Sequence, residues 1–244
     1  MTEVHSETSL HSGNRVWGFN KDYISEFVYG GIDGAITTFA VVAGATGAEA
    51  GIYWVLIFGF ANLIADGFSM SVGNFFSVKA ERDNFEKHKK IEYWEVEHLP
   101  DKEIQEIRDI YRNKGFKGEL LERVVDVITT DRDVWVDTMM KEELEMTKDT
   151  KSPFKTALAT FLSFNIIGII PLLSYVTSAL FEFKGHLFLI SCVATGIALM
   201  LVGYLKSEVT ATSHWKGMLE TFLLGGLAAL LAYFAGDLLG SYFL

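Results

Sequence analysis

Five long apolar segments set the first limit on how this chain can fold. A helix needs about 20 mostly apolar residues to cross a bilayer, and irregular backbone cannot satisfy its polar groups in lipid. The sequence therefore predicts an all-α membrane protein with five transmembrane helices. The expected helices cover Ile24–Ala48, Ile52–Val78, Phe154–Phe181, His186–Leu205 and Gly217–Phe243.

The charges gather between the second and third apolar segments. Residues 79–151 hold 15 Lys and Arg and 20 Asp and Glu, out of 21 and 31 in all 244 residues. This partition excludes a single globular core. The net charge of −10 excludes a nucleic-acid binder, because such proteins present a basic patch. Cys192 is the only cysteine, which excludes a disulfide framework.

The basic residues of the short connections predict the orientation of the chain. Lys and Arg favour the cytoplasmic side of a membrane. They occur in the N-terminal tail and between the fourth and fifth segments, whereas the turn 47–51 has none. We expect the tail and the charged block in the cytoplasm, and a prokaryotic inner membrane rather than a vacuole. The expected parts are a tail (1–22), two transmembrane helices (23–78), a cytoplasmic helical metal-binding domain (79–151) and three further helices (152–244).

Acidic residues within the apolar segments are candidates for function, because a carboxylate at membrane depth is costly. Asp33 lies in the first segment. Asn62, Asp66 and Met70 in the second are spaced by four, so they share one helix face. Carboxylates bind divalent metals, and a thioether favours the softer transition metals. A polar packing seam between helices is the alternative interpretation.

The charged block is expected to form a small helical bundle. The second apolar helix continues past Lys79 without a Gly or Pro. Pro100 suits the first turn of a new helix, and Thr130 or Asp131 is a candidate N-cap. The further helices are expected over Pro100–Asn113, Gly118–Ile128 and Arg132–Thr147.

One set of side chains in this bundle has metal-binding chemistry. Carboxylates at three-residue spacing share a helix face, and thioethers beside them suit Fe²⁺, Mn²⁺ or Zn²⁺. Spacing alone favours ordinary solvated glutamates, because 20 acidic residues must fall somewhere. The candidates are Glu92, Glu95, Glu103, Glu106, Met139, Met140 and Glu143.

Taken together, both halves of the sequence resemble the vacuolar iron transporter family, which moves Fe²⁺, and often Mn²⁺, out of the cytoplasm in exchange for protons. The order of several short motifs carries the resemblance. They are Gly31-Ile-Asp33-Gly34, Ala43-Gly-x-x-Gly-Ala48, Ser69-Met70-x-x-Gly73, Glu92-x-x-Glu95, Pro100-x-x-Glu103-x-x-Glu106 and Trp135-Val-Asp-x-Met139-Met140-x-x-Glu143.

The resemblance implies a role for each matched residue. Asp33 and Met70 would lie on the ion path, and the seven residues of the charged block would bind metal in the cytoplasm. Typical members carry a glutamate where this chain has Asn62. Asp66, one turn later, is therefore expected to bind the proton or metal in place of that glutamate. The resemblance also implies a homodimer in the lipid bilayer, with protons as the exchanged ion. No prosthetic group is expected, and Fe²⁺ or another divalent metal is the substrate.

Two other functions remain open at this level. Glu95-x-x-His98 is the element used in di-iron carboxylate bundles, which would suit a membrane-anchored iron-binding or oxidising protein. Only one such element is present, and two are needed. A metal sensor without transport is the other alternative. An ATP-driven pump is not expected, because the chain has no Gly-x-x-x-x-Gly-Lys-Ser/Thr loop.

Overall fold

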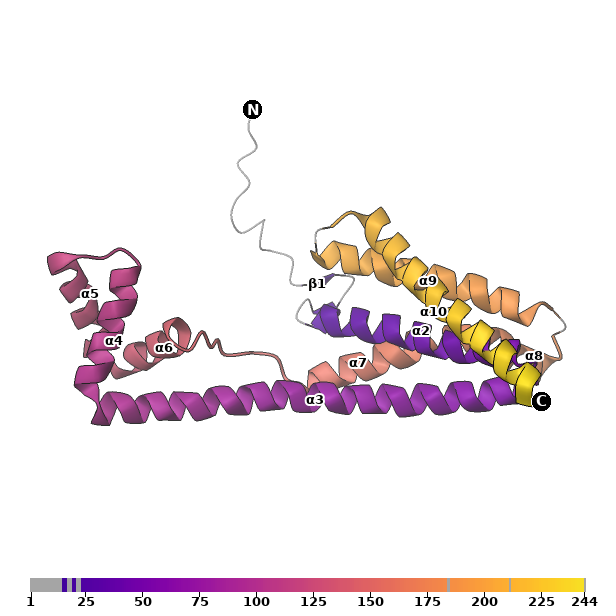
Figure 1. Ribbon diagram of the computed structural model, residues 1–244, viewed down its shortest axis with the longest axis horizontal. Helices are drawn as coiled ribbons and strands as arrows, with labels where there is room; N and C mark the ends of the chain where they lie inside the picture. Colours follow the sequence, from indigo (N-terminus) through magenta and orange to yellow (C-terminus); the bar gives the residue numbers. More distant parts are fainter. Residues whose placement is uncertain (1–14, 17–18, 21–22, 184, 211, 244) are drawn as a thin grey trace, which may run out of the picture. The chain divides into compact units, whose positions relative to one another are not determined.

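The chain divides into two compact units (Figure 1). The structure is a computed structural model that describes residues 15–16, 19–20, 23–183, 185–210 and 212–243. We call the part up to Phe75 and from Ser152 onward the spanning unit, and Phe76–Lys151 the charged unit. The sequence analysis placed the first of these boundaries at residue 79.

The spanning unit consists of helices apart from a two-residue β ladder. The prediction of an all-α chain with five candidate membrane-spanning helices is confirmed for the described residues. Apart from the ladder, the expected tail 1–22 lies outside them. The elements are β1 (Arg15–Val16), β2 (Phe19–Asn20), α2 (Ile24–Gly47), the first half of α3 (Ile52–His98), α7 (Pro153–Gly168), η2 (Ile170–Leu172), α8 (Leu173–Phe181), α9 (Leu187–Thr210) and α10 (His214–Phe243).

Helix α2 packs against α7, α9 and α10, and glycines allow the closest approaches. A Cβ atom added at Gly34 would overlap the backbone of Phe164 on α7. One added at Gly236 on α10 would overlap the backbone of Gly44 on α2. Small residues are typical of such contacts, because lipid gives no hydrophobic drive and close van der Waals packing must hold the helices.

The third predicted transmembrane helix is interrupted, which the sequence analysis missed. Pro171 has no backbone N–H and cannot continue the α-helical ladder, so a 3₁₀ turn, η2, separates α7 from α8. The Ser191 hydroxyl of α9 donates to the Pro171 carbonyl at 2.7 Å, and Ser174 donates to the Leu187 carbonyl at 3.0 Å. These bonds satisfy backbone groups near the break and join it to α9.

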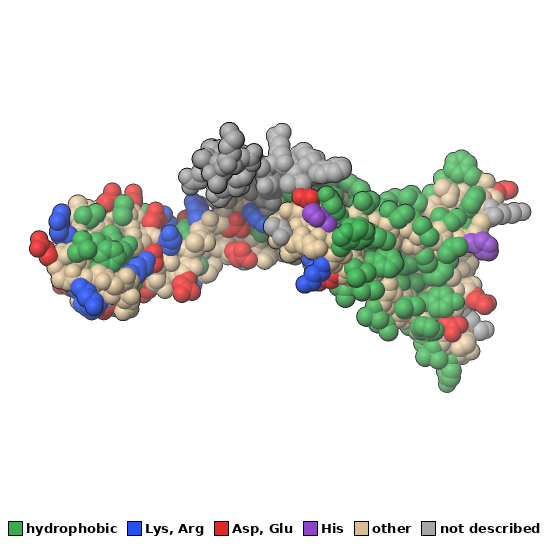
Figure 2. All heavy atoms as spheres, turned by 90° about the horizontal axis from the view of Figure 1, so that it is seen from above, with side chains coloured by type: hydrophobic (Ala, Val, Ile, Leu, Met, Phe, Trp, Pro, Cys, Tyr) green, Lys and Arg blue, Asp and Glu red, His purple; other side chains and the backbone are tan. Residues whose placement is uncertain are grey.

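The outer surface of the spanning unit is apolar. Figure 2 shows hydrophobic side chains over its helices, while Lys, Arg, Asp and Glu gather on the charged unit. Large exposed side chains such as Phe68, Leu201 and Leu231 belong to this surface. Such a surface suits contact with lipid, in agreement with the five candidate spans.

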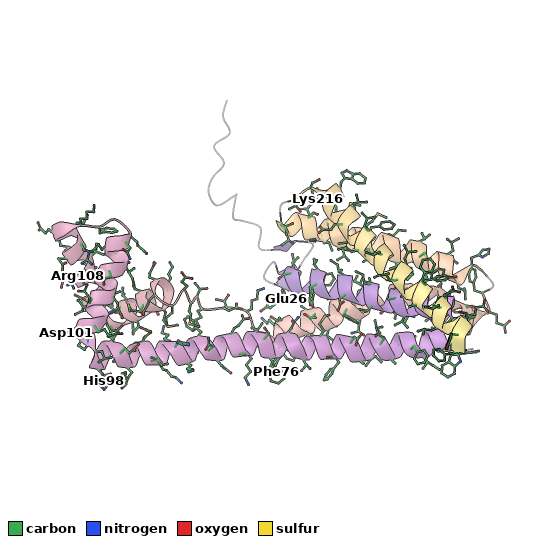
Figure 3. All side chains as sticks on the ribbon, in the orientation of Figure 1. Glu26, Phe76, His98, Asp101, Arg108 and Lys216 are labelled. Atoms are coloured by element: carbon green, nitrogen blue, oxygen red, sulfur yellow. The ribbon has the colours of Figure 1, made fainter. Side chains whose placement is uncertain are left out.

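The charged unit is a helical bundle with its own apolar core. It contains the second half of α3, α4 (Pro100–Asn113), α5 (Gly118–Thr130) and α6 (Arg132–Glu142). Figure 3 marks His98 at the end of α3 and Asp101 at the start of α4, on either side of the turn at Leu99 and Pro100. The core side chains are Phe85, Val96, Ile107, Leu121, Val125, Ile128, Trp135, Val136, Met139 and Met140.

The caps and ends of these helices partly match the sequence analysis. Asp131 caps α6, because its carboxylate accepts from the backbone N–H groups of Asp133 and Val134 at 2.9 and 3.2 Å. The prediction that this helix reaches Thr147 was wrong. It ends at Glu142, and Glu145 takes a left-handed φ of 52°, which turns the chain away.

Two glycines of α10 provide a matched test of the close packing. Gly236→Ala puts a methyl group against the Gly44 backbone, which cannot rotate away, and overpacking costs about 1–3 kcal/mol. Gly226→Ala meets no atom within 4 Å. We expect thermal unfolding in detergent to show a lower melting temperature for Gly236→Ala only. Equal melting temperatures would contradict the proposed closeness of α2 and α10.

Candidate functional site

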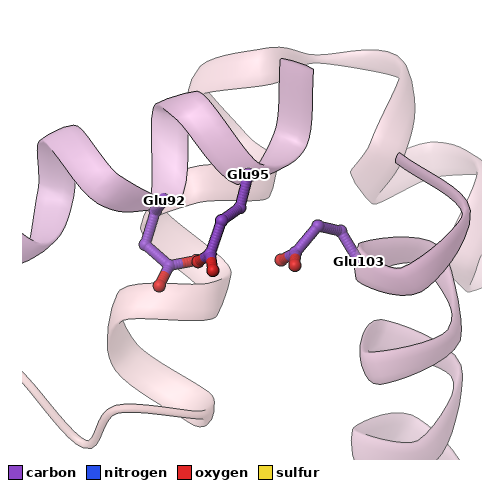
Figure 4. A group of neighbouring side chains, drawn as sticks. All are labelled: Glu92, Glu95 and Glu103. Atoms are coloured by element: carbon purple, nitrogen blue, oxygen red, sulfur yellow. The ribbon is translucent and has the colours of Figure 1, made fainter. Parts of the chain in front are cut away.

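Five glutamates of the charged unit converge where α3 ends and α4 begins. Glu92 and Glu95 lie on the last turns of α3, Glu103 and Glu106 on the first turns of α4, and Glu143 directly after α6. The chain changes direction at Leu99 and Pro100, between the end of α3 and the start of α4 (Figure 1), and the two helices present their glutamates to one another. Figure 4 shows Glu92, Glu95 and Glu103 pointing toward one another from these two helices.

The five side chains form two triads that share one member. Carboxylate oxygens of Glu92, Glu95 and Glu103 lie within 4.8 Å of one another, and so do those of Glu103, Glu106 and Glu143. Each triad offers the oxygen ligands that a divalent cation uses. The structure thus brings together all the glutamates that the sequence analysis singled out in this unit.

Two of these carboxylates are buried without a full set of partners. Glu92 is 3% exposed and Glu103 is 1% exposed. Oε2 of Glu92 and both oxygens of Glu103 have no hydrogen-bond partner among the described residues. Lys102 Nζ lies 3.7 Å from Glu103 Oε1, which is too far for a hydrogen bond, and 3.0 Å from Glu106 Oε1. Buried charge of this kind needs a proton or a cation.

The surroundings raise the proton affinity of these groups. Burial, followed by repulsion from Glu143 and the other glutamates, raises the pKa of Glu92 to about 7. Burial and repulsion from Glu106 and Glu95 raise the pKa of Glu103 to about 7. Burial also raises the pKa of Glu143. Near neutral pH this cluster therefore exchanges protons readily, and a metal ion bound there would compete with the protons.

The two methionines and the histidine of this region lie differently from the glutamates. Met139 and Met140 are fully buried in the apolar core beside Ile107, so packing alone accounts for their burial. Their role as metal ligands stays a prediction. His98 is exposed, its Nδ1 lies 2.8 Å from the Trp94 carbonyl, and its ring stacks on Trp94. This orientation does not support a di-iron Glu-x-x-His site.

The second candidate region is in the spanning unit, where α2 and α3 approach α7. Phe164 is fully buried, and its backbone and ring fill the space that side chains at Gly34 and Gly67 would need. These glycines directly follow Asp33 and Asp66 in the chain. The two carboxylates lie close enough to repel each other. The structure thus places Asp33 and Asp66, the two candidate carboxylates of the first two spans, within range of each other's charge.

An open groove of 640 Å³ adjoins Asp66. Asn62 and Asp66 supply its polar side chains, and small apolar residues of α2 and α3 supply most of the rest. The Nδ2 atom of Asn62 is buried and has no partner among the described residues. Met70, one turn beyond Asp66 on α3, is half-buried. Outside this groove, Glu220 of α10 pairs with Lys206 of α9 at 3.0 Å.

The sequence analysis missed Asn165. Its Nδ2 donates to the Phe161 carbonyl at 2.8 Å and lies 2.8 Å from where a Cβ atom added at Gly67 would be. An amide inside an otherwise apolar span is itself a signal of function or of helix packing. Asn165 was missed because its amide is neutral and the search was for charged side chains.

The raised pKa values predict how metal-free stability depends on pH. In the unfolded chain Glu92 and Glu103 titrate near their ordinary pKa of 4.5, whereas in the folded chain they hold protons up to about pH 7. Their contribution to stability is complete below pH 4.5 and is lost as the pH rises through 7. We expect the melting temperature of metal-free protein to fall between pH 5 and pH 8. Added Mn²⁺ should raise it most at pH 8, and a metal effect equal at both pH values would contradict the assignment.

Comparison with known proteins identifies the relatives of this chain. The family model described as "VIT family" matches residues 24–237. The "Vacuolar iron transporter" of Toxoplasma gondii is 34% identical over 227 residues, which cover 90% of this chain and 75% of the relative. The protein of the same name from Plasmodium berghei is 33% identical, covering 97% and 90%. "Vacuolar iron transporter 1" of Oryza sativa subsp. japonica is 32% identical, covering 87% and 83%.

These matches bear on two predictions. The relatives carry the name of a transporter, so the prediction of a transporter rather than an enzyme is confirmed. The matched region runs from the first residue of α2 into α10 and includes the whole charged unit. The resemblance seen in the sequence motifs is therefore confirmed, and the chain belongs to the VIT family.

Proposed function

We propose that this protein exports Fe²⁺ from the cytoplasm across its membrane in exchange for protons, and that Mn²⁺ is a second substrate. The observation that carries the proposal is the presence of two carboxylates, Asp33 and Asp66, on the first two candidate spans. An anchor would have no reason to bear the cost of two carboxylates at membrane depth. The names of the relatives support iron as the substrate.

The charged unit would capture the ion. Because Glu103 belongs to both triads, we propose that two divalent ions bind there and share its carboxylate. Protons compete for the same oxygens near neutral pH, since the pKa values of Glu92 and Glu103 are about 7. Release of the ion is then coupled to protonation, and neighbouring carboxylates titrate as a group rather than singly.

The spanning unit would carry the ion past Met70, Asp66 and Asp33. A thioether and carboxylates together suit a divalent transition metal. In this proposal Asp66 replaces the glutamate that typical relatives have at the place of Asn62, and it alternates between metal and proton. The positive-inside pattern supports a cytoplasmic charged unit. The choice of a prokaryotic inner membrane stays a prediction.

We propose that the protein is a homodimer, and the exposure of the groove beside Asp66 supports this proposal. Asp66 is exposed in the single chain, beside a groove that is otherwise lined mainly by apolar side chains. Facing lipid, that carboxylate would be unstable. A second copy placed against α2 and α3 would cover the groove and shelter the ion path. The exposed apolar side chains of α3, such as Phe58, Ile64 and Phe68, fit such a contact.

Transport by purified protein in lipid vesicles tests the proposal. We expect an imposed pH gradient to drive Fe²⁺ flux under anaerobic conditions, and reversal of the gradient to reverse the flux. Asp33→Asn and Asp66→Asn should each lower the flux at least about tenfold, because one ligand and proton carrier is lost. The control is Asp237→Asn, an exposed carboxylate near the end of α10.

The outcomes separate the competing functions. Metal binding with no flux in unaltered protein would favour a sensor or a storage protein. Rapid oxygen consumption on adding Fe²⁺ would favour an oxidising protein. Full proton-coupled flux in Asp66→Asn would reject the proposal that Asp66 replaces the glutamate that typical relatives have at position 62.

Removal of the shared carboxylate tests the two-ion capture site. We expect Glu103→Gln to lower Mn²⁺ affinity at least about tenfold, measured by calorimetry, because both triads lose a ligand. The matched control is Glu122→Gln. Glu122 is an exposed carboxylate of the same unit that pairs with Arg108 outside both triads. Unchanged affinity or unchanged stoichiometry in Glu103→Gln would contradict the bridging role.

A further inference from the structure

A hydrogen bond between α3 and α7 fixes the orientation of an amide in the spanning unit. Asn74 Nδ2 donates to Thr160 Oγ1 at 2.8 Å. Thr160 is fully buried and donates its own hydroxyl hydrogen to the Thr156 carbonyl at 3.1 Å. A hydroxyl has only one hydrogen, so Thr160 must accept from Asn74. The amide therefore turns its NH₂ group toward α7, and its carbonyl oxygen Oδ1 faces away from Thr160.

Asn74 continues the row of polar side chains on α3. It follows Met70 by four residues and Asp66 by eight, and α3 is unbroken over this range. With a rise of 1.5 Å per residue, Asn74 lies about 6 Å along the helix from Met70 and about 12 Å from Asp66. The spanning unit ends on α3 at Phe75. Asn74 is therefore the last polar group of this row before the helix enters the charged unit.

The chemistry of Asn74 differs from that of Met70. An amide carbonyl is a hard oxygen ligand that suits Mn²⁺, whereas a thioether suits softer ions. The Asn74 side chain is half-buried, and its hydrogen bond to Thr160 uses the NH₂ group and not the carbonyl oxygen. One turn earlier on α7, Thr156 is 2% exposed and its Oγ1 has no partner within the described part of the chain. A water molecule carried by an ion would satisfy that hydroxyl.

We propose that Asn74 Oδ1 is a further metal ligand on the transport path and receives the partly hydrated ion before Met70. Thr160 is its positioning residue, because it holds the NH₂ group and so directs the oxygen. This inference rests on the proposed transport function. The proposed ligand is a hard oxygen on the part of α3 that precedes the charged unit. Such a ligand favours Mn²⁺ and Fe²⁺ over softer ions.

The test compares initial rates of Mn²⁺ and Co²⁺ uptake into vesicles over a range of metal concentrations. Asn74→Ala should raise the KM for Mn²⁺ about tenfold, with a smaller rise for Co²⁺ and little change in maximal rate. Asn74→Asp keeps an oxygen ligand and should hold the KM at or below that of unaltered protein. Thr160→Val should raise the KM, and Thr160→Ser, which keeps the acceptor, should not. The control is Ser71→Ala, whose hydroxyl donates only within α3, to the Gly67 carbonyl.

A purely structural hydrogen bond would behave differently. Asn74→Ala and Asn74→Asp would then lower the maximal rate or the protein yield alike and leave the KM unchanged, which would overturn the inference. If Asn74→Ala does not fold, an unchanged KM in Thr160→Val overturns it instead. Absence of any uptake by unaltered protein would reject the proposed function, and the inference with it. Uptake by unaltered protein with an unchanged KM in Asn74→Ala would reject the inference alone.

Discussion

The close backbone contact of α2 with its neighbours is the constraint on which the spanning unit depends. Gly34 allows α7 to approach, and Gly44 faces Gly236 of α10. Without a hydrophobic drive in lipid, such contacts supply much of the attraction between helices. They also decide where function can reside. Asp33 directly precedes Gly34 in the chain, so a residue that brings α2 against α7 is the neighbour of a carboxylate of the first span.

A second constraint is common to both candidate regions: a carboxylate withdrawn from water must gain a cation or a proton. In the charged unit, burial and then repulsion among five glutamates raise the pKa values of Glu92 and Glu103 to about 7, so these two groups exchange protons near neutral pH. In the spanning unit, Asp33 and Asp66 repel each other in surroundings that are largely apolar. In each case a set of bare charges is unfavourable, and a bound divalent ion would relieve the repulsion.

Much of the fold could be predicted, because long apolar runs and Asp131 as a cap are local signals. Pro171 shows the limit: a uniformly apolar run has no periodicity that reveals a break, although the proline itself was visible. The glutamates were correctly selected, but spacing could not show that Glu103 is buried and shared. That depends on the angle between α3 and α4, which the turn at Leu99 sets. The hydrogen bond of Asn74 lies between helices far apart in sequence, and no local pattern predicts it.

Lys102 bears on the ion selectivity of the proposed capture site. Its ammonium group lies beside Glu106 and approaches Glu103, so the triad of Glu103, Glu106 and Glu143 already has a tethered monovalent cation next to it. A sodium or potassium ion gains little by replacing a charge equal to its own that is held in place by the chain. A divalent ion brings twice the charge and can displace the lysine. The tethered amine would thus favour divalent over monovalent ions at the proposed capture site.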